Sequence, residues 1–120
     1  MTDPNTVADT YLATWNSHDP ELRRKLIENA WSLAASYVDP LMSGNGREAI
    51  STMIAAAREH FPGHIFSLRG APDGHGEHVR FSWTLTSPDG VAVGGGTDVA
   101  TLDETGRIDR VIGFLDGGVA

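Results

Sequence analysis

Three polar side chains in this sequence lie where a helix or a strand would point them into an apolar core. Tyr11 belongs to an apolar stripe near the N-terminus, Asp39 ends an apolar segment, and Asp98 interrupts a stretch rich in glycine and valine. A buried carboxyl group must be neutralised, hydrogen-bonded or paired, so its acidity is shifted. Because shifted acidity is typical of binding and catalytic sites, these residues are the first candidates for chemistry.

Each of the three residues also has a purely structural explanation. Tyr11 could be a core tyrosine, because a buried tyrosine usually finds a partner without any catalytic role. Asp39 precedes a proline, and aspartate before proline commonly starts a turn. Asp98 could face solvent, although aspartate is depleted in strands. The sequence alone leaves these explanations open.

The composition limits what such a site can serve. The chain has 120 residues, 40% hydrophobic and 21% charged, which fits one domain spanning residues 1–120. A net charge of -7, with nine scattered lysines and arginines, argues against nucleic-acid binding. No apolar run could cross a membrane and the first residues contain no secretion signal, so we expect a cytoplasmic protein. The absence of cysteine excludes disulfides, thiolate nucleophiles and cysteine-ligated zinc.

Hydrophobic spacing predicts three helices in the first half of the chain. The Asp-Pro pairs at 3–4 and 19–20 are typical helix starts, and apolar residues then recur at intervals of three and four. We expect the first helix to end near Ser17, the second to be short, and the third to span residues 47–60. Residues 31–38 predict a brief strand that precedes a loop at 43–46.

The second half alternates with the period of β-strands. Strands are predicted at 64–68, 78–86, 91–102 and 108–115, with turns at 73–74, 88–90 and 104–106. Helices followed by antiparallel strands indicate an α+β fold in which the helices cover one face of a curved sheet. No helix follows Gly94-Gly95-Gly96, so it is not a phosphate loop. It predicts instead a bulge or a close approach of another backbone, as a sheet bending around a pocket requires.

Further side chains are candidates for binding an apolar ligand. They are seven aromatic residues and one arginine: Trp15, Trp31, Tyr37, Phe61, Phe66, Arg80, Trp83 and Phe114. Most aromatic residues in a small domain belong simply to the core. Arg80 alternates with apolar residues, and the sequence does not tell which face lines the pocket. An inward Arg80 would favour an anionic ligand and lower the pKa of Asp98, whereas an exposed one would pair with a neighbouring acid.

Metal binding is not predicted. His75 and His78 lie among acidic and glycine residues, a metal-like composition. Both fall near a hairpin turn, however, and two histidines three apart in a turn supply no defined ligand geometry. We therefore expect neither a metal nor a cofactor.

Four segments resemble the ketosteroid isomerases and, more widely, the family that shares the nuclear transport factor 2 (NTF2) and polyketide-cyclase (SnoaL-like) fold. They are residues 11–19, Val38-Asp39-Pro40, residues 46–50 and Thr97-Asp98-Val99-Ala100. The resemblance implies an α+β cone, with three N-terminal helices packed on a strongly curved, mainly antiparallel sheet. It also implies roles, with Asp39 as the general base and Tyr11 and a protonated Asp98 as hydrogen-bond donors to an oxyanion.

From this resemblance we expect a small cofactor-independent enzyme that transfers protons next to a carbonyl group of an apolar or aromatic ligand. The alternative is a non-catalytic module of the same fold that binds a small molecule or dimerises. The limonene epoxide hydrolases use an Asp-Arg-Asp trio, but Ser82 and Gly113 stand where its aspartates would fall, which disfavours epoxide hydrolysis. An uncovered sheet face, with Phe81, Trp83 and Leu85 or corresponding residues of neighbouring strands, predicts a homodimer.

Overall fold

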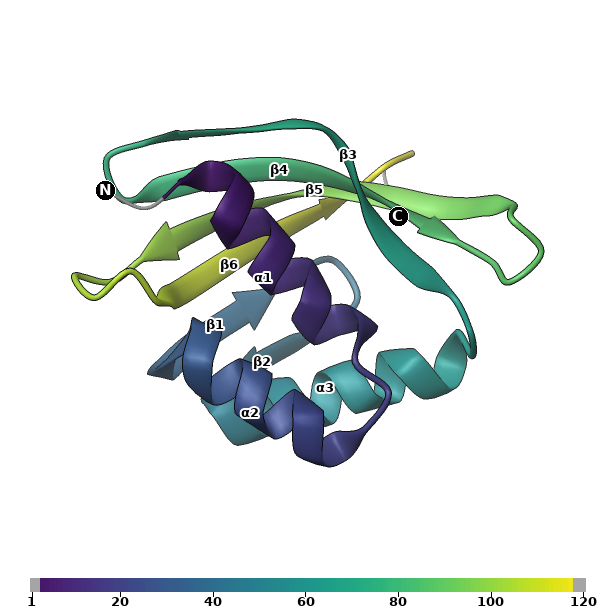
Figure 1. Ribbon diagram of the computed structural model, residues 1–120, viewed down its shortest axis with the longest axis horizontal. Helices are drawn as coiled ribbons and strands as arrows, with labels where there is room; N and C mark the ends of the chain where they lie inside the picture. The colour runs from purple at the N-terminus through teal and green to yellow at the C-terminus, as the bar shows by residue number, and fades with distance from the viewer. Residues whose placement is uncertain (1–2, 118–120) are drawn as a thin grey trace.

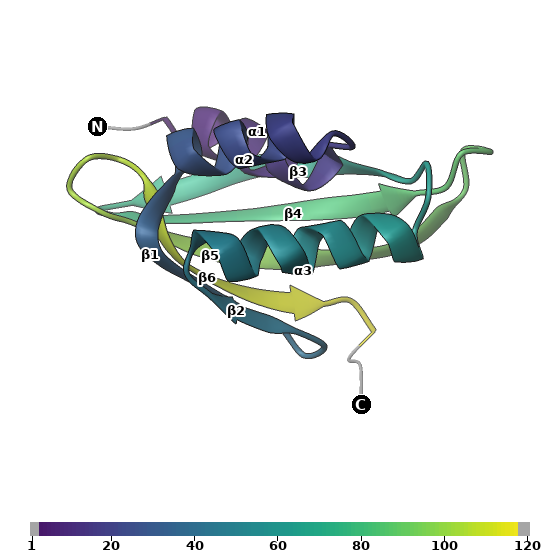
Figure 2. The same ribbon diagram turned by 90° about the horizontal axis from the view of Figure 1, so that it is seen from below.

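Three helices cover one face of a six-stranded sheet in a computed structural model that describes residues 3–117 (Figures 1 and 2). The predicted domain extends beyond these limits, and residues 1–2 and 118–120 lie outside the described residues. The α+β architecture and the three helices match the predicted cone. The helices all lie on the concave side of the sheet (Figure 2).

The helices begin where the sequence predicts. Helix α1 (Pro4–Asn16) and helix α2 (Pro20–Ala30) each follow an aspartate whose side chain accepts a hydrogen bond from a backbone N–H of the first turn. Such caps satisfy donors that the helix itself leaves unpaired. Helix α3 (Arg47–His60) follows Gly46, whose φ of 87° suits glycine. None of the described helices is long and apolar enough to span a membrane.

The strands form one mixed sheet. They are β1 (Trp31–Val38), β2 (Ser43–Asn45), β3 (Ile65–His75), β4 (His78–Thr86), β5 (Ala92–Leu102) and β6 (Ile108–Leu115). Their order is β2-β1-β6-β5-β4-β3, and every neighbouring pair is antiparallel except β1 and β6. The last strand, β6, therefore lies between the first long strand, β1, and β5.

Two predicted connections are wrong. Residues 43–45, predicted as loop, form the short edge strand β2, because the backbone turns at Asp39 and pairs back onto β1. The turn predicted at 73–74 lies further along the chain. Strand β3 continues to His75 after an irregularity between Arg69 and Asp73, and the turn is at Gly76, whose φ is 56°.

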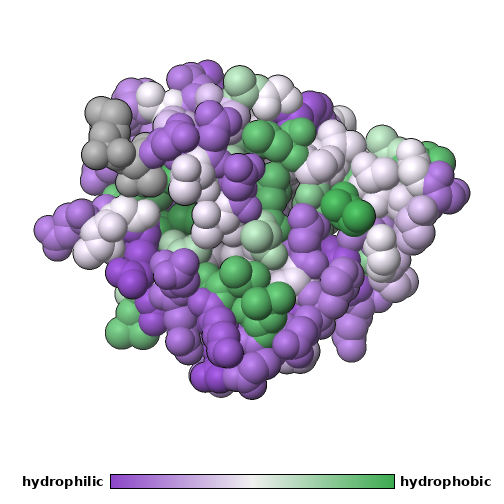
Figure 3. All heavy atoms as spheres, in the orientation of Figure 1, coloured by the Kyte–Doolittle hydropathy of each residue, from purple (hydrophilic) through white to green (hydrophobic). Residues whose placement is uncertain are grey.

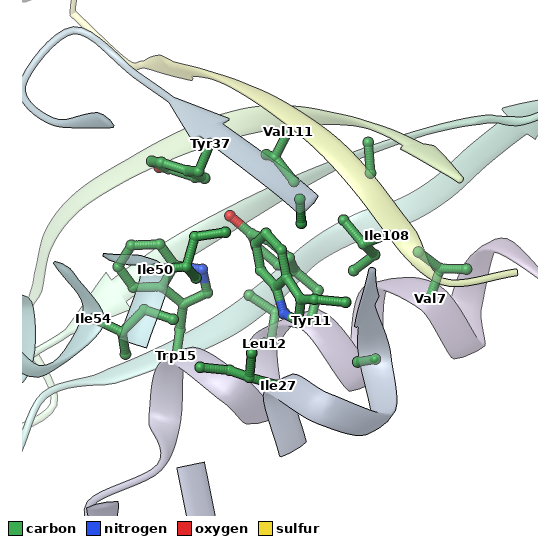
Figure 4. Packing of buried hydrophobic residues seen from close by; sticks show 14 of the residues in the cluster. Val7, Tyr11, Leu12, Trp15, Ile27, Tyr37, Ile50, Ile54, Ile108 and Val111 are labelled. Carbon is green, nitrogen blue, oxygen red and sulfur yellow. The ribbon is translucent and has the colours of Figure 1, made fainter. Parts of the chain in front are cut away.

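The core fills the space between the helices and the inner sheet face. Figure 4 shows Tyr11 and Trp15 of α1 packed among aliphatic side chains from α2, α3 and β6. Two buried arginines hold the end of α1, because Arg23 donates to the Ser17 carbonyl and Arg58 to the Trp15 carbonyl, at 2.8 and 3.4 Å. A cation near a helix C-terminus is favourable, so these contacts fix the part of α1 that presents Trp15.

No described helix covers the outer face of the sheet. The apolar set first considered for this face lies elsewhere, because Phe81 and Leu85 are buried and Trp83 faces the helices. Several large apolar side chains of the strands are exposed. They include Leu33 and Val38 of β1, Ile65 of β3 and Phe114 of β6.

Candidate active site

A cavity of about 290 Å³ lies between the inner face of the sheet and helices α1 and α3. Its lining is mostly apolar and includes, among the described residues, no lysine, arginine or histidine. The lining residues are Tyr11, Leu12, Trp15, Tyr37, Asp39, Leu41, Met42, Ala57, Phe61, Phe66, Trp83, Leu85, Val93, Gly94, Gly95, Asp98, Leu115 and Asp116. Hydrophobic side chains also reach the surface near the middle of the face drawn in Figure 3, within a largely hydrophilic surround.

Tyr11 and Asp98 form a buried hydrogen bond in the wall of this cavity. The Tyr11 hydroxyl donates to Asp98 Oδ2 at 2.7 Å, and both side chains are only 2% exposed. Helical spacing places Tyr11 on the inner face of α1, and the alternation of β5 places Asp98 beside Phe81 of β4 on the inner face of the sheet. The solvent-facing explanation for Asp98 is therefore wrong. No described residue donates a hydrogen bond of normal length and angle to the second oxygen of Asp98, Oδ1.

Burial shifts the acidity of both partners. Loss of solvent raises the pKa of Asp98 from 3.8 to about 6, while the Tyr11 hydroxyl and the approach of the Trp83 indole lower it and the charge of Asp39 raises it. Burial and then the Asp98 charge raise the pKa of Tyr11 well above 10.0. Tyr11 thus stays a proton donor at neutral pH. Asp98, in contrast, gains and loses its proton near neutrality.

Asp39 lies at the end of β1, lines the same cavity and is held by three donors. The Tyr37 hydroxyl donates to Oδ2 at 2.6 Å, and the backbone N–H groups of Leu41 and Met42 donate to Oδ1 at 2.7 and 2.9 Å. These backbone bonds are those of an Asp turn, so the turn explanation for Asp39 also holds. An ionised carboxylate can accept all three bonds.

Gly113 brings the two acids together. It pairs with Asp98 across β5 and β6, and a Cβ atom built on it would lie 2.8 Å from Asp98 Oδ1. The same point is 3.2 Å from Asp39 Cβ and 3.3 Å from the Tyr37 hydroxyl. The missing side chain of Gly113 therefore leaves the space in which the carboxyl of Asp98 and the side chains of Asp39 and Tyr37 approach one another.

The structure separates the other predicted ligand contacts into two groups. Five aromatic residues line the cavity together with Tyr11, Asp39 and Asp98: Trp15, Tyr37, Phe61, Phe66 and Trp83. Three residues do not line it: Trp31, Arg80 and Phe114.

The placements of these three residues follow from burial and strand alternation. Trp31 is fully buried behind Tyr11, with ring centroids 5.6 Å apart, and Phe114 is exposed on the outer face. Arg80 also points outward and pairs with Asp73 at 2.9 Å. The exposed alternative for Arg80 is therefore the one observed, and no cation from β4 enters the cavity.

Several lining residues were not predicted. Met42, Val93 and Leu115 come from strands or turns whose inner face could not be assigned from sequence. Tyr37 and Asp39 are two apart, so strand alternation could have predicted that they share a face. The glycine run was interpreted correctly as a close approach, because Gly94 and Gly95 line the cavity and a Cβ on Gly96 would lie 2.4 Å from the Phe114 carbonyl oxygen.

The histidine pair lies apart from the cavity. The rings of His75 and His78 are 5.7 Å apart across the β3–β4 turn. Within residues 3–117, no group of three or more histidine, cysteine, aspartate or glutamate side chains is placed to hold a metal ion.

Comparisons with solved structures place the fold among known proteins. The chain is 58% identical to a proposed isomerase of the SnoaL-like family from Agrobacterium tumefaciens, with a TM-score of 0.94 over 98% of this chain and 100% of that one. Two more distant structures share the fold. One is a proposed SnoaL-like polyketide cyclase from Jannaschia, with 17% identity and a TM-score of 0.73 over 97% of this chain and 90% of that one. The other is a SnoaL-like protein of unknown function from Burkholderia thailandensis, with 13% identity and a TM-score of 0.77 over 98% of this chain and 99% of that one. No protein-family model and no curated protein matches the sequence.

Proposed function

Because this chain belongs to the SnoaL-like family, we propose that it is a cofactor-independent enzyme that moves a proton on a carbon next to the carbonyl group of an apolar ligand. The observation that supports this most is the buried Tyr11–Asp98 pair in the wall of an apolar cavity that Asp39 also lines. Removing such a proton creates an enolate, which requires a base near the carbon and a donor at the oxygen.

In the proposed reaction, the ionised Asp39 takes the proton from the carbon, and the electron pair of the broken C–H bond moves into the enolate. Protonated Asp98 donates a hydrogen bond to the enolate oxygen. Asp39 then returns the proton to another carbon of the same enolate, so that a double bond changes position and no atom is gained or lost. Tyr11 donates its hydrogen bond to Asp98 Oδ2, and Asp98 in turn donates to the ligand, so Tyr11 acts through Asp98 and does not contact the ligand directly.

This assignment requires a protonated Asp98 and therefore has a defined pH dependence. The pKa of Asp98 is about 6 in the protein without ligand, so its protonated fraction falls as the pH rises through that value. The value of kcat/KM reports ionisations of the free enzyme. We therefore expect kcat/KM to fall above about pH 6.

The experiment that tests the proposal follows the conversion of a bicyclic β,γ-unsaturated ketone to its conjugated isomer by absorbance. The wild type should accelerate the conversion, and Asp39→Asn and Asp98→Asn should each lower kcat/KM by at least about a hundredfold, the lower end of the usual contribution of a general acid or base. Asp9→Asn is the matched control, because Asp9 is exposed on α1 and loses the same charge. A wild type without activity, or an active Asp39→Asn variant, would contradict the proposal.

We also propose that the protein forms a homodimer through the outer face of the sheet. Leu33, Val38 and Phe114 are 76%, 44% and 58% exposed there. Exposed apolar side chains grouped on one sheet face are typical of a surface that a second copy covers.

A further inference from the structure

We propose that the same cavity also binds protonated primary amines that carry an apolar body of one or two rings. This inference rests on the charge and lining of the cavity and not on the proposed reaction. Asp98 and Asp39 both line the cavity, and no salt bridge among the described residues reaches either of them. A buried carboxylate without a cation is unfavourable, so a cationic ligand would supply the missing partner.

The nearby cations of the protein are engaged elsewhere. Arg69 pairs with Asp116 at the rim at 2.7 Å, and Arg80 pairs with Asp73 outside the cavity. Arg58 donates to the carbonyls of Trp15 and His64. None of the three lines the cavity, and the charge of Arg69 is paired with the lining residue Asp116, so an ammonium group at Asp98 and Asp39 would meet two carboxyl groups that no arginine pairs with.

The shape and walls of the cavity also suit an amine of this kind. The Trp83 indole approaches the Asp98 carboxyl group, but among the described residues Oδ1 accepts no hydrogen bond of normal geometry, so it offers an acceptor for an ammonium N–H. Charge-assisted hydrogen bonds of this type are stronger than neutral ones. The faces of Trp15, Trp83 and Phe66 attract a cation, and the lining around them accepts apolar rings. A volume of about 290 Å³ is at the low end for ligand pockets, which limits the apolar body to one or two rings.

Binding of an amine should depend on pH in the opposite sense to the proposed reaction. The ammonium pairs with ionised Asp98, so affinity should increase as the pH rises through about 6. The groups that face Asp98 are Tyr11 from α1, Tyr37 and Asp39 from β1 and its end, and the Trp83 indole from β4. Burial raises the pKa values of Tyr11 and Tyr37 above their ordinary value, so neither phenol ionises in this range.

The test is isothermal titration calorimetry with three matched probes: 2-naphthylmethylamine, 2-naphthylmethanol and 2-naphthoate. At pH 7.5 we expect the amine to bind at least about tenfold more tightly than the alcohol, since hydrogen bonds to charged groups exceed neutral ones by about that factor. The carboxylate should not bind. At pH 5 the preference for the amine should shrink severalfold. Asp98→Asn should remove the preference and keep alcohol binding, whereas Asp9→Asn should leave both affinities unchanged.

Any of four outcomes would overturn the inference, and the first three concern the relative affinities of the probes. They are equal binding of amine and alcohol, preferential binding of the carboxylate, and a preference for the amine that survives Asp98→Asn. Failure of all three probes to bind would overturn it as well. Tight amine binding without proton transfer would support the inference and contradict the proposed reaction, and proton transfer without amine preference would do the reverse.

Discussion

Asp98 should make the stability of the protein depend on pH in a way that Asp98→Asn removes. The folded pKa of about 6 is higher than the ordinary value of 3.8 because the carboxyl group is buried. The contribution of such a carboxyl group to the free energy of unfolding is complete at pH values below its unfolded pKa. That contribution is lost as the pH rises through the folded pKa. The wild type should therefore lose stability relative to the variant between about pH 4 and pH 7.

The magnitude follows from the difference between the two pKa values. A difference of about two, at about 1.4 kcal/mol for each pKa unit, gives about 3 kcal/mol. The residue is 2% exposed, so solvent screening reduces this value little. Other ionisable groups are present in both proteins, and their contributions largely cancel in the difference.

The assay is urea unfolding of wild type, Asp98→Asn and Asp9→Asn at several pH values from 4 to 7.5. The free energy of unfolding of Asp98→Asn minus that of the wild type should increase by about 2.4 kcal/mol over this range, because the unfolded carboxyl group is already partly ionised at pH 4. The same difference for Asp9→Asn should change little, because Asp9 is exposed. A difference for Asp98→Asn that stays constant, or that decreases with pH, would refute the account of Asp98 as a carboxyl group with a raised pKa.

Three other substitutions test single contacts. Tyr11→Phe removes a hydrogen bond that lowers the pKa of Asp98. A carboxyl-carbon NMR titration of the variant should therefore find the pKa of Asp98 higher by about one to two units. An unchanged or lower pKa would contradict this. Gly113→Ala places a methyl group 2.8 Å from Asp98 Oδ1 and should lower the free energy of unfolding by about 1–3 kcal/mol, measured by urea unfolding. The control Gly44→Ala meets its neighbours at an ordinary 3.4 Å, so an equal loss in both variants would argue against crowding at Gly113. Phe114→Ser should convert a dimer to a monomer in sedimentation velocity, and a monomeric wild type would contradict the proposed interface.

The helices were predictable because their signals are local. The Asp-Pro pairs mark the starts of α1 and α2, and the spacing of apolar residues gives α3 its bounds. Strand β2 was not predictable, because Ser43-Gly44-Asn45 has the composition of a loop and pairs only where β1 offers an edge. The end of β3 was misplaced for a related reason, since Asp73-Gly74 is a turn sequence that here continues a strand.

The candidate site was predictable in its residue types and less so in its geometry. Alternation separates the two faces of β4, but only the packing of Phe81 against Tyr11 establishes which face is the inner one. Because Arg80 lies on the opposite face from Phe81, the same packing determines that Arg80 points outward. Phe114 was misplaced because the register between β5 and β6 determines its face. The same register puts Gly113 beside Asp98, so the approach of the two acids to Gly113 could not be derived from sequence alone.

In the proposed reaction Asp39 moves a proton on a carbon next to a carbonyl group, and Asp98 donates a hydrogen bond to the enolate oxygen. The most direct test is proton NMR of a bicyclic ketone in heavy water near pH 6, with deuterium incorporation at that carbon followed over time. Exchange of this proton should be faster with the wild type than in the solution without protein. With Asp39→Asn the exchange should fall to the uncatalysed rate, and with Asp9→Asn it should equal that of the wild type. Exchange at the uncatalysed rate with wild-type protein, or undiminished exchange with Asp39→Asn, would contradict the claim.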